Sequence, residues 1–326
     1  MSSKIDFSKI KNSVLKNLLL AAQKAGIEVK QVDPAFLTFC LQYKNKKHYL
    51  YFKKFGLNKT NNVLVANKYL TNKILKQIGL KTPMAFLART KNDALRLIAN
   101  KKLKYPFVIK PLSATWGIAV TSKIENQNDL AHALKEIKLY WQKNPKKRKV
   151  FIIEEYIEGN DYRLLALNNN VIATTWRKFP EIIGNGKKTI KNLIDQYYKQ
   201  KNQKPIYDSE VLRNLKKEKM TLENILPKGQ IIRLRHTANI HSGGLAVNVT
   251  NKVHPYYKQI VRKATKDLGI NFCGVDLITK DISQKGNYAI IELNSSPSLS
   301  MHEKPDIGQP VSVSKLIFKS IFPDLK

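Results

Sequence analysis

Three residues near the carboxyl end of the chain carry side-chain oxygens at a spacing that suits a divalent cation. Glu292 and Asn294 lie two residues apart in IIELNSSP, and Asp276 lies upstream in GVDLIT. Alternate side chains of a strand point to one face, so Glu292 and Asn294 would point the same way. A hairpin across DISQKGN would bring Asp276 beside them, and such oxygen ligands suit Mg²⁺ held together with substrate phosphates.

The alternative for these residues is an ordinary hairpin whose polar side chains face water. The two acidic residues, however, stand in the apolar runs FCGVDLI and YAIIELN. A charge on a buried strand must be paired or bound to a metal. The setting therefore favours a metal or phosphate role for the three residues.

Two lysines are candidates for phosphate contacts. Lys110 ends the apolar strand YPFVIKP, where its ammonium group would emerge into a cleft and meet a phosphate. A lysine that snorkels at a strand end gives the same pattern. Lys68 opens the helical stretch NKYLTNK and is more ambiguous, because a helix face with Lys68 and Lys73 occurs on any basic protein. The loop SATWGIAV could fold over a nucleotide, although a surface turn is the default for a loop with the single glycine Gly117.

The segment FIIEEYIEGNDYRLL indicates a nucleotide contact. A strand that runs into a short turn exposes the backbone groups of Glu155, Tyr156 and Ile157, which could read an adenine edge. Asp161 could then take the ribose hydroxyls. The structural alternative is an acidic turn that balances nearby lysines, in a chain that is otherwise short of carboxylates.

Three arginines and one glycine loop offer further anion contacts. Planar guanidinium groups suit phosphate or carboxylate oxygens, although each arginine alone is equally a surface charge. In NIHSGG, the backbone amides of Ser242, Gly243 and Gly244 could approach an anion closely, and a tight turn explains the loop equally well. The arginines on predicted alternating strands are Arg163, Arg177 and Arg235.

Other catalytic signatures are missing from the sequence. The six histidines show no HxxxH or HExxH spacing, so zinc bound by histidines is unsupported. Cys40 and Cys273 are the only cysteines, and their apolar neighbours predict reduced, buried thiols. Neither GxSxG nor GxxxxGK[ST] occurs, so a phosphate site would be of another type.

The composition is that of a basic globular protein. The chain has 326 residues, of which 43% are hydrophobic, and this predicts one to three domains. No apolar run approaches the roughly 20 residues that span a bilayer, and the first residues lack the apolar core of a signal peptide, so we expect a cytoplasmic protein with no membrane span. The net charge of +34 would attract nucleotides, acidic substrates, nucleic acid or anionic membranes. The lysines are spread along the chain, so a dedicated nucleic-acid domain is not favoured, and a lysine-rich composition explains the charge equally well.

Apolar periodicity predicts an α+β chain. The helix VLKNLLLAAQKAG and the strands that follow it form a small α/β lobe. Strands and helices then alternate to VFIIEEYI, as in a compact α+β lobe ending near Glu154. A larger lobe follows, with a helical polar stretch from Thr189 to Met220, the metal hairpin and a final helix from Pro310 to Phe322.

The order of these motifs resembles the ATP-grasp ligases over about residues 15 to 322. The likeness is strongest to the ATP-grasp portions of cyanophycin synthetase and of the bifunctional glutamate-cysteine ligase/glutathione synthetase. The corresponding runs here are EEYIEGNDYRLLA, GNGKKTIKNLI, LPKGQIIRLRHTANIHSGG, NKVHP and IIELNSSPSLSMH. The resemblance implies a small N-terminal α/β lobe over residues 1–66 and an ATP-grasp domain over 67–326, whose two α+β lobes, about 82–154 and 155–326, clamp ATP.

The resemblance also implies roles for individual residues. Those that would bind ATP are Lys68, Lys110, Glu154, Glu155, Tyr156, Ile157 and Asp161. Those that would bind Mg²⁺, with Mn²⁺ as the alternative metal, are Asp276, Glu292 and Asn294. Those that would act in catalysis are Arg235, Ser242, Gly243, Arg163 and Arg177, with Arg235 and the HSGG loop facing the acyl phosphate and its carboxylate precursor.

Enzymes of this kind activate a carboxylate with ATP and let an amine attack the acyl phosphate. We therefore expect a stand-alone carboxylate-amine ligase that acts on an amino acid or a short peptide, because nothing in the chain resembles a Mur-ligase or a glutamate-cysteine ligase module. Where the relatives have a glycine-rich loop such as DGNHGRG, this chain has SATWGIA, which predicts a stiffer lid. The alternatives are a nucleotide-binding protein without turnover that holds a polyanion, and a ligase that modifies a protein terminus. A homo-oligomer is compatible with either.

Overall fold

The computed structural model describes residue 5 and residues 7–10, 13–33, 38–51, 57–58, 65–114 and 117–325. The chain divides into two compact units, each made of separate segments. The first unit comprises Met1–Thr82, Tyr162–Trp176 and Val247–Lys326, and the second comprises Pro83–Asp161 and Arg177–Ala246. The second unit therefore combines the lobe predicted at about residues 82–154 with a part of the larger lobe predicted at about 155–326.

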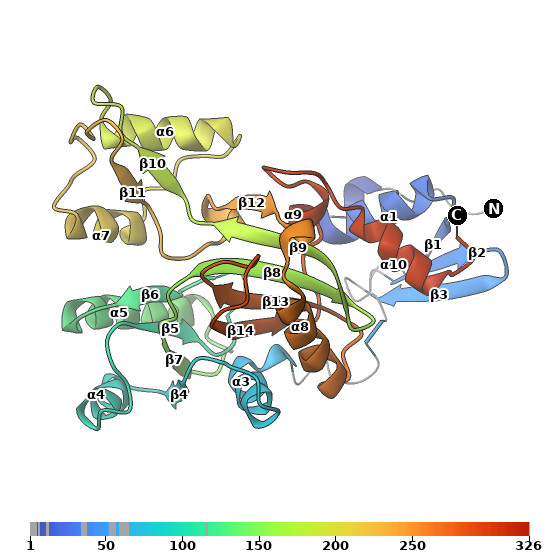
Figure 1. The fold of residues 1–326 in the computed structure, drawn as a ribbon, viewed down its shortest axis with the longest axis horizontal. Coiled ribbons are helices and arrows are strands. Elements are labelled where there is room, and N and C mark those ends of the chain that lie inside the picture. The colour runs from blue at the N-terminus through green and yellow to red at the C-terminus, as the bar shows by residue number, and fades with distance from the viewer. Residues whose placement is uncertain are drawn as a thin grey trace. The chain divides into compact units, whose positions relative to one another are not determined.

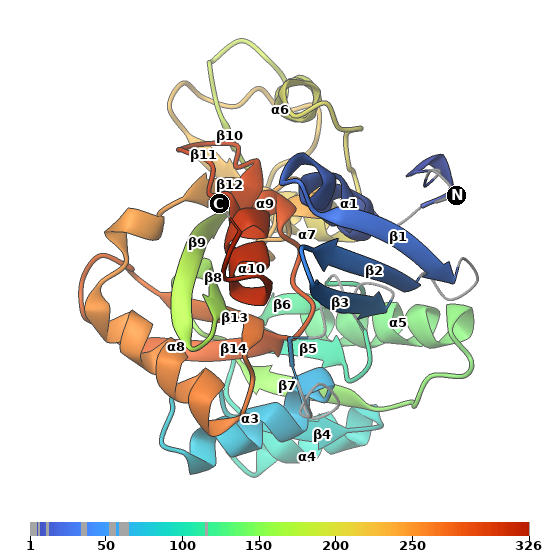
Figure 2. The same ribbon diagram turned by 90° about the vertical axis from the view of Figure 1, so that its right-hand side faces the viewer.

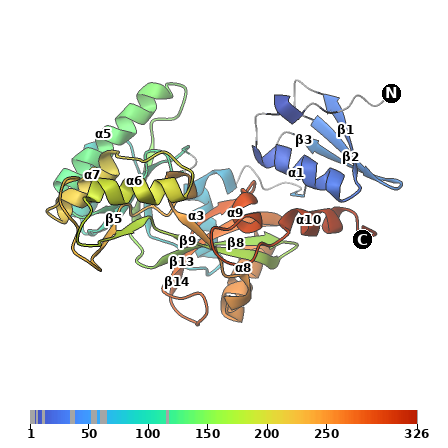
Figure 3. The same cartoon turned by 90° about the horizontal axis from the view of Figure 1, so that it is seen from above.

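The first unit begins with the predicted small α/β lobe. Its elements are η1 (Phe7–Lys9), α1 (Ser13–Lys24), β1 (Glu28–Asp33), β2 (Thr38–Tyr43) and β3 (Lys46–Tyr51). The strands form an antiparallel sheet in the order β1-β2-β3, seen side by side in Figure 2. Helix α1 lies along this sheet and beside α10 (Val313–Ile321), as Figure 3 shows. The helix is amphipathic because leucines and alanine recur every three or four residues, and the buried ones are Leu15, Leu18, Leu19 and Ala22.

A five-stranded sheet forms the centre of the first unit (Figure 1). Its order is β12 (Leu245–Asn248), β9 (Asn170–Lys178), β8 (Asn160–Leu167), β13 (Phe272–Thr279) and β14 (Tyr288–Asn294), and β8, β9 and β12 extend into the second unit. Helices α8 (Pro255–Asp267) and α3 (Lys68–Gln77) cover one face, where Leu164 and Val275 are buried. The opposite face shares a core with the small lobe through Leu165 and Phe272. The short elements η3 (Thr250–Lys252) and α9 (Ser300–Glu303) complete the unit.

The second unit contains a four-stranded sheet and a two-stranded ribbon. The sheet order is β4 (Ala85–Ala88), β7 (Phe151–Glu155), β5 (Phe107–Pro111) and β6 (Thr121–Ile124), packed against α4 (Lys91–Ala99) and α5 (Gln127–Lys143). The ribbon pairs β10 (Glu181–Ile183) with β11 (Ile231–Arg233) and packs against α6 (Ile190–Gln200) and α7 (Ser209–Lys217). A short 3₁₀ helix, η2 (Ile240–Ser242), follows β11.

The polar stretch expected as one helical region from Thr189 to Met220 is two helices. Helix α6 ends at Gln200 and α7 begins at Ser209. Pro205 lies between them, and proline removes a backbone donor and disfavours helical backbone in the residue before it. Asp208 then caps α7 by accepting hydrogen bonds from the backbone amides of Glu210 and Val211, both at 3.2 Å.

The prediction of reduced, buried cysteines is confirmed. Cys40 and Cys273 are free and buried, and burial raises the pKa of the Cys273 thiol to about 12. Among the helices of the described ranges, none has both the length and the apolar character for a bilayer crossing.

Candidate functional site

The predicted metal residues lie on a hairpin of the first unit. Strands β13 and β14 pair antiparallel with Asp276 opposite Glu292 and Gly274 opposite Asn294. The hairpin expected across DISQKGN is thereby confirmed, and the two carboxylates come side by side. The register of the pairing shifts directly after Asp276, so the pairs Asp276–Glu292 and Gly274–Asn294 lie on the same side of this irregularity. The side-chain oxygen of Asn294 accepts a hydrogen bond from the amide of Ser296 at 3.0 Å.

Arg163 holds the buried carboxylate of Asp276 from the neighbouring strand β8. Its Nε and Nη2 atoms donate to the two carboxylate oxygens, each at 2.6 Å. This bidentate geometry fixes the plane of the carboxylate. Gly274 gives the arginine room, because a Cβ at Gly274 would lie 3.3 Å from Arg163 Cδ and 3.1 Å from Pro297 Cβ.

Lys68 stands next to the second carboxylate of the hairpin. It is the first residue of α3, whose N-cap is Asn67. Its Nζ lies 3.3 Å from Glu292 Oε2, and the two side chains are 10% and 29% exposed. Glu292 is therefore the more accessible of the two hairpin carboxylates, since Asp276 is buried.

In the second unit, the predicted phosphate ligand Lys110 forms a buried ion pair. Its Nζ lies 2.6 Å from Glu154 Oε2, and the side chains are only 6% and 4% exposed. The antiparallel pairing of β5 and β7 brings these residues together, with Lys110 opposite Ile152 and Val108 opposite Glu154. The sequence also allowed that Lys110 snorkels into solvent at the end of its strand, and the burial of its side chain rules this out.

The remaining nucleotide candidates follow β7 in the second unit. Glu155 is exposed, and its carboxylate accepts a hydrogen bond from the amide of Met84 at 3.3 Å. Tyr156 and Ile157 are half-buried, and burial raises the pKa of the Tyr156 hydroxyl. Asp161 Oδ1 accepts from both Nε and Nη2 of Arg177, at 2.8 and 2.6 Å. Two residues that the sequence assigned separately thus form one ion pair.

Arg235 differs from its predicted setting. It lies beyond the end of β11 rather than on a strand, and its guanidinium is bound by Asp208 and Glu210. Burial alone would lower the pKa of Arg235, but its hydrogen bond to Asp208 and the negative charge of Glu210 raise it, so the group stays cationic. The sequence reading missed Asp208 and Glu210. Their signal is the helix start in YDSEVLRNLKK, where an acidic N-cap precedes a second acidic residue.

The HSGG loop is held by its own backbone and by α6. The amides of Ser242, Gly243 and Gly244 donate to backbone oxygens within the loop, at 3.1, 3.3 and 3.0 Å. The carbonyl oxygens of the same three residues accept from side chains of the α6 region, which are Tyr198, Tyr197 and Lys201. The loop amides expected to meet an anion are therefore engaged in the tight turn, which was the alternative for this segment.

Glycine is required at position 243 for two reasons. Its φ is +103°, and a Cβ there would lie 2.6 Å from the hydroxyl oxygen of Tyr198. The predicted lid also meets this loop region, because a Cβ at Gly117 would lie 3.1 Å from Asn239 Nδ2. Residues 115 and 116 of the lid lie outside the described residues.

His236 gives a pH-dependent prediction for the second unit. Burial lowers its pKa from 6.5 to about 4, with Lys123 and Arg233 adding to the effect. The unfolded chain takes up a proton first as the pH falls, so the stability that neutral His236 contributes above pH 6.5 is lost between pH 6.5 and about 4. When the pH falls from 6.5 to about 4, we expect the His236→Gln variant to lose less free energy of unfolding than the native chain, as measured by urea denaturation. Equal losses in both proteins would contradict the shift.

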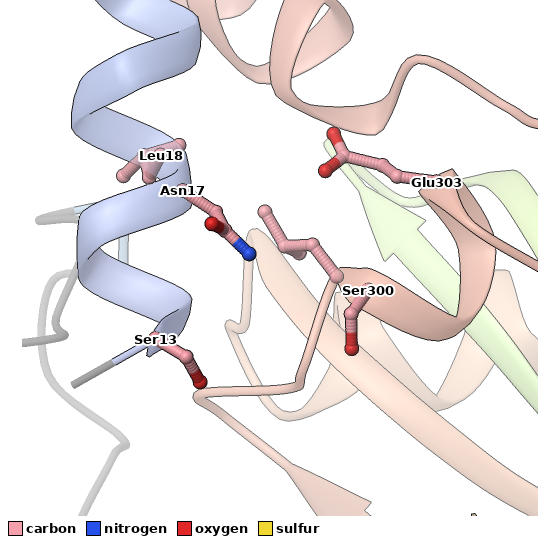
Figure 4. A pocket seen from close by; sticks show the side chains of 6 residues that line it. Ser13, Asn17, Leu18, Ser300 and Glu303 are labelled. Atoms are coloured by element: carbon pink, nitrogen blue, oxygen red, sulfur yellow. The ribbon is translucent and has the colours of Figure 1, made fainter. Parts of the chain in front are cut away.

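One small pocket lies apart from these residues, in the first unit (Figure 4). It is a cavity of about 20 Å³ between α1 and α9, lined by Ser13, Asn17, Leu18, Leu299, Ser300 and Glu303. That volume holds about one water molecule and is far too small for a nucleotide. The charged residues described above, and not this cavity, are the functional candidates.

Comparison with known proteins places these observations in a family. A model described as a RimK-like ATP-grasp domain matches residues 65–203 and 230–317. The glutathione biosynthesis bifunctional protein of Streptococcus agalactiae is 32% identical over 307 residues, covering 87% of this chain and 40% of that protein. The cyanophycin synthetase of Synechocystis is 29% identical over 272 residues, covering 80% of this chain and 30% of that protein.

A solved structure agrees with the sequence relatives. The bifunctional glutathione synthetase from Pasteurella multocida aligns with a TM-score of 0.65 at 25% identity, over 96% of this chain and 44% of that chain. The chain thus spans less than half the length of each of these three proteins. The α+β ATP-grasp fold and the family resemblance expected from the motifs are confirmed. This chain belongs to the RimK-like ATP-grasp family.

Proposed function

We infer that the chain is an ATP-dependent carboxylate-amine ligase. The observation that carries this proposal is the hairpin of the first unit, where Asp276 and Glu292 stand in register and Arg163 orients one of them. The family match supports it, as do relatives whose names describe glutathione biosynthesis and cyanophycin synthesis. Such relatives make amide bonds between amino acids or peptides.

The donor set of the hairpin fits Mg²⁺. Two adjacent carboxylates and the nearby amide of Asn294 supply hard oxygen ligands. The thiol of Cys273 on the same strand is fully buried, and burial raises its pKa to about 12, so it stays protonated and is no competing ligand. Asp276 and Glu292 would hold the cation, and Arg163 would keep the plane of the Asp276 carboxylate fixed through its two hydrogen bonds. When bound, the metal would neutralise charge on the triphosphate.

The cations would act on the phosphates of ATP. Lys68 places a positive charge 3.3 Å from Glu292, beside the proposed metal ligands. Lys110 is held in one position by Glu154, so little side-chain entropy remains to be lost when a phosphate binds. Preorganised charges of this kind stabilise the transferring phosphoryl group more than the ground state.

The proposed reaction has two steps. The substrate carboxylate oxygen attacks the γ-phosphorus of ATP, which forms an acyl phosphate and breaks the bond to ADP. An amine then attacks the acyl carbon, which forms the amide, releases inorganic phosphate and leaves a proton to solvent. Arg235 and Arg177 are the proposed cations for the carboxylate and the acyl phosphate. The net charge of +34 favours an acidic carboxylate donor.

The test is ADP release with Mg²⁺-ATP against a matrix of amino acids and short peptides, in which each carboxylate donor is paired with each amine. We expect release that requires both partners, together with a product whose mass equals the sum of the partners minus one water. Tight binding of ADP, with no ADP formed from ATP under any pairing, would contradict the proposal and favour a nucleotide-binding protein without turnover.

A further inference from the structure

Helix α7 lies between the two segments of the chain that match the RimK-like ATP-grasp family, and it forms ion pairs with residues of both segments. The unmatched residues are 204–229. The apolar side of α7 is buried against α6 and the β10–β11 ribbon through Val211 and Leu215. Asn214 also donates to the carbonyl oxygen of Leu234 at 3.0 Å. The insert is therefore an integral part of the second unit and not a peripheral loop.

The first turn of α7 fixes three consecutive residues after β11. Glu210 Oε2 lies 2.8 Å from Arg235 Nη1, and Asp208 binds the other terminal nitrogen of the guanidinium. Glu210 Oε1 accepts from the backbone amide of His236 at 3.1 Å, and Thr237 Oγ1 donates to Oε2 at 3.3 Å. One carboxylate thus holds a side chain and the backbone that follows it, so Arg235 has a single orientation.

The rest of α7 is bonded to β6, to the start of α5 and to the turn between them. Arg213 Nη2 donates to the carbonyl oxygen of Ser122 at 3.2 Å. Lys217 Nζ lies 2.7 Å from Glu125 and 2.8 Å from Asp129. Strand β6 pairs directly with β5, the strand that carries Lys110.

Three of the bonded positions of α7 follow helical spacing. Residues 210, 213 and 217 are separated by three and four positions and so lie along one side of the helix. Because an α-helix rises 1.5 Å per residue, this side spans about 10 Å. Each end carries charges opposite to those of its partners, so the helix connects two distinct parts of the unit by ion pairs.

We propose that α7 is a positioning element that sets Arg235 relative to the sheet that carries Lys110, with Glu210 as the positioning residue for Arg235. This inference rests on the proposed function, in which Arg235 meets the substrate carboxylate while Lys110 meets ATP. The rigid connection would keep the two substrate-binding cations at a constant separation. Glu210 itself touches no substrate in this scheme and acts through Arg235.

Three variants separate this role from simple stability. Glu210→Gln keeps the size of the side chain and removes the charge that holds Arg235. Asp208→Asn also removes a charge, but asparagine retains the N-cap, so α7 is expected to stay folded. Glu218→Gln is the matched control, because Glu218 is an exposed residue at the carboxyl end of the same helix.

The first measurement is hydrogen exchange of the whole chain by mass spectrometry, which needs no substrate. We expect Glu210→Gln and Asp208→Asn to speed exchange in peptides covering residues 234–238, with residues 107–111 unchanged and Glu218→Gln like the native chain. MgADP affinity, measured by calorimetry, is expected to stay within about twofold of native, because the Lys110 sheet is undisturbed. Unchanged exchange at 234–238 in both variants would overturn the proposal, as would a general loss of protection across the unit.

The second measurement uses whichever substrate pair supports ADP release in the native chain. Glu210→Gln and Asp208→Asn are each expected to raise the KM for the carboxylate substrate at least tenfold and to leave the KM for ATP nearly unchanged. Equal loss in both parameters would show a merely structural role and overturn the positioning of Arg235. If the native chain releases no ADP with any pair, the proposed function fails, and the hydrogen-exchange result still decides whether α7 fixes Arg235.

Discussion

Replacing Glu292 with glutamine is expected to lower the rate of ADP formation by about three orders of magnitude, because the loss of one carboxylate ligand weakens charge stabilisation by about 4 kcal/mol. Glutamine keeps the size of the side chain and loses the negative charge beside Asp276. The fold is expected to tolerate the change, since Glu292 is 29% exposed and its ion pair with Lys68 does not lie in a closed core. The measurement is ADP release over a Mg²⁺ titration, with the unfolding midpoint as a check on folding.

Asp281→Asn is the control for this experiment. Asp281 lies in the turn of the same hairpin and is exposed, and its carboxylate accepts hydrogen bonds from the backbone amide and the hydroxyl of Ser283. Its substitution is expected to leave the rate within a factor of about two of native. A Glu292→Gln protein that keeps a tenth or more of the native rate at saturating Mg²⁺ would exclude Glu292 as a metal ligand.

Replacing Lys110 with methionine is expected to cost about 3–5 kcal/mol of the free energy of unfolding, because it leaves the carboxylate of Glu154 buried without its cation. Glu154 is 4% exposed, so water cannot replace the lost partner. The same variant is expected to lose MgADP affinity, since Lys110 is a proposed phosphate ligand. Urea denaturation gives the first quantity and calorimetry the second.

The double variant Lys110→Met with Glu154→Gln separates the two effects. Removing both charges is expected to restore most of the stability, because neither group is then left as an unpaired buried ion. MgADP affinity is expected to remain low. Lys104→Met is the matched control, because Lys104 is exposed near the start of β5 and its loss is expected to change stability by less than about 0.5 kcal/mol. Recovery of MgADP affinity in the double variant would show that Lys110 serves only to neutralise Glu154.

These experiments test a charge pattern common to both units. Every cation that the sequence singled out is bound by a carboxylate within its own unit. The carboxylates are Glu292, Glu154, Asp276, Asp161, Asp208 and Glu210. In a chain with 58 basic and 24 acidic residues, this use of scarce carboxylates is informative. A buried cation must be compensated, and these partners also fix its direction before a ligand arrives.

Much of the fold follows from the local pattern of the sequence. Leucines spaced at three and four residues gave the amphipathic α1, and alternation gave β8, β9 and the β13–β14 hairpin. Where two amphipathic helices follow each other closely, the pattern failed to separate them. The stretch from Thr189 to Met220 has helical apolar spacing on both sides of Pro205, so the break at this proline and the separate start of α7 were lost in one helical region.

The sequence by itself determined which residue types are available for chemistry and that Asp276 and Glu292 meet, because a short hairpin brings neighbouring strands into a register that local rules describe. Only the tertiary structure decided the partners of the cations. Arg163 reaches Asp276 across 113 positions, and Lys110 reaches Glu154 through the pairing of strands that are not consecutive in the chain. Arg235 lies 25 residues from Glu210, across an irregular segment and β11. No local periodicity encodes such contacts, because each depends on how separate elements pack to bury their apolar faces while keeping buried charges paired.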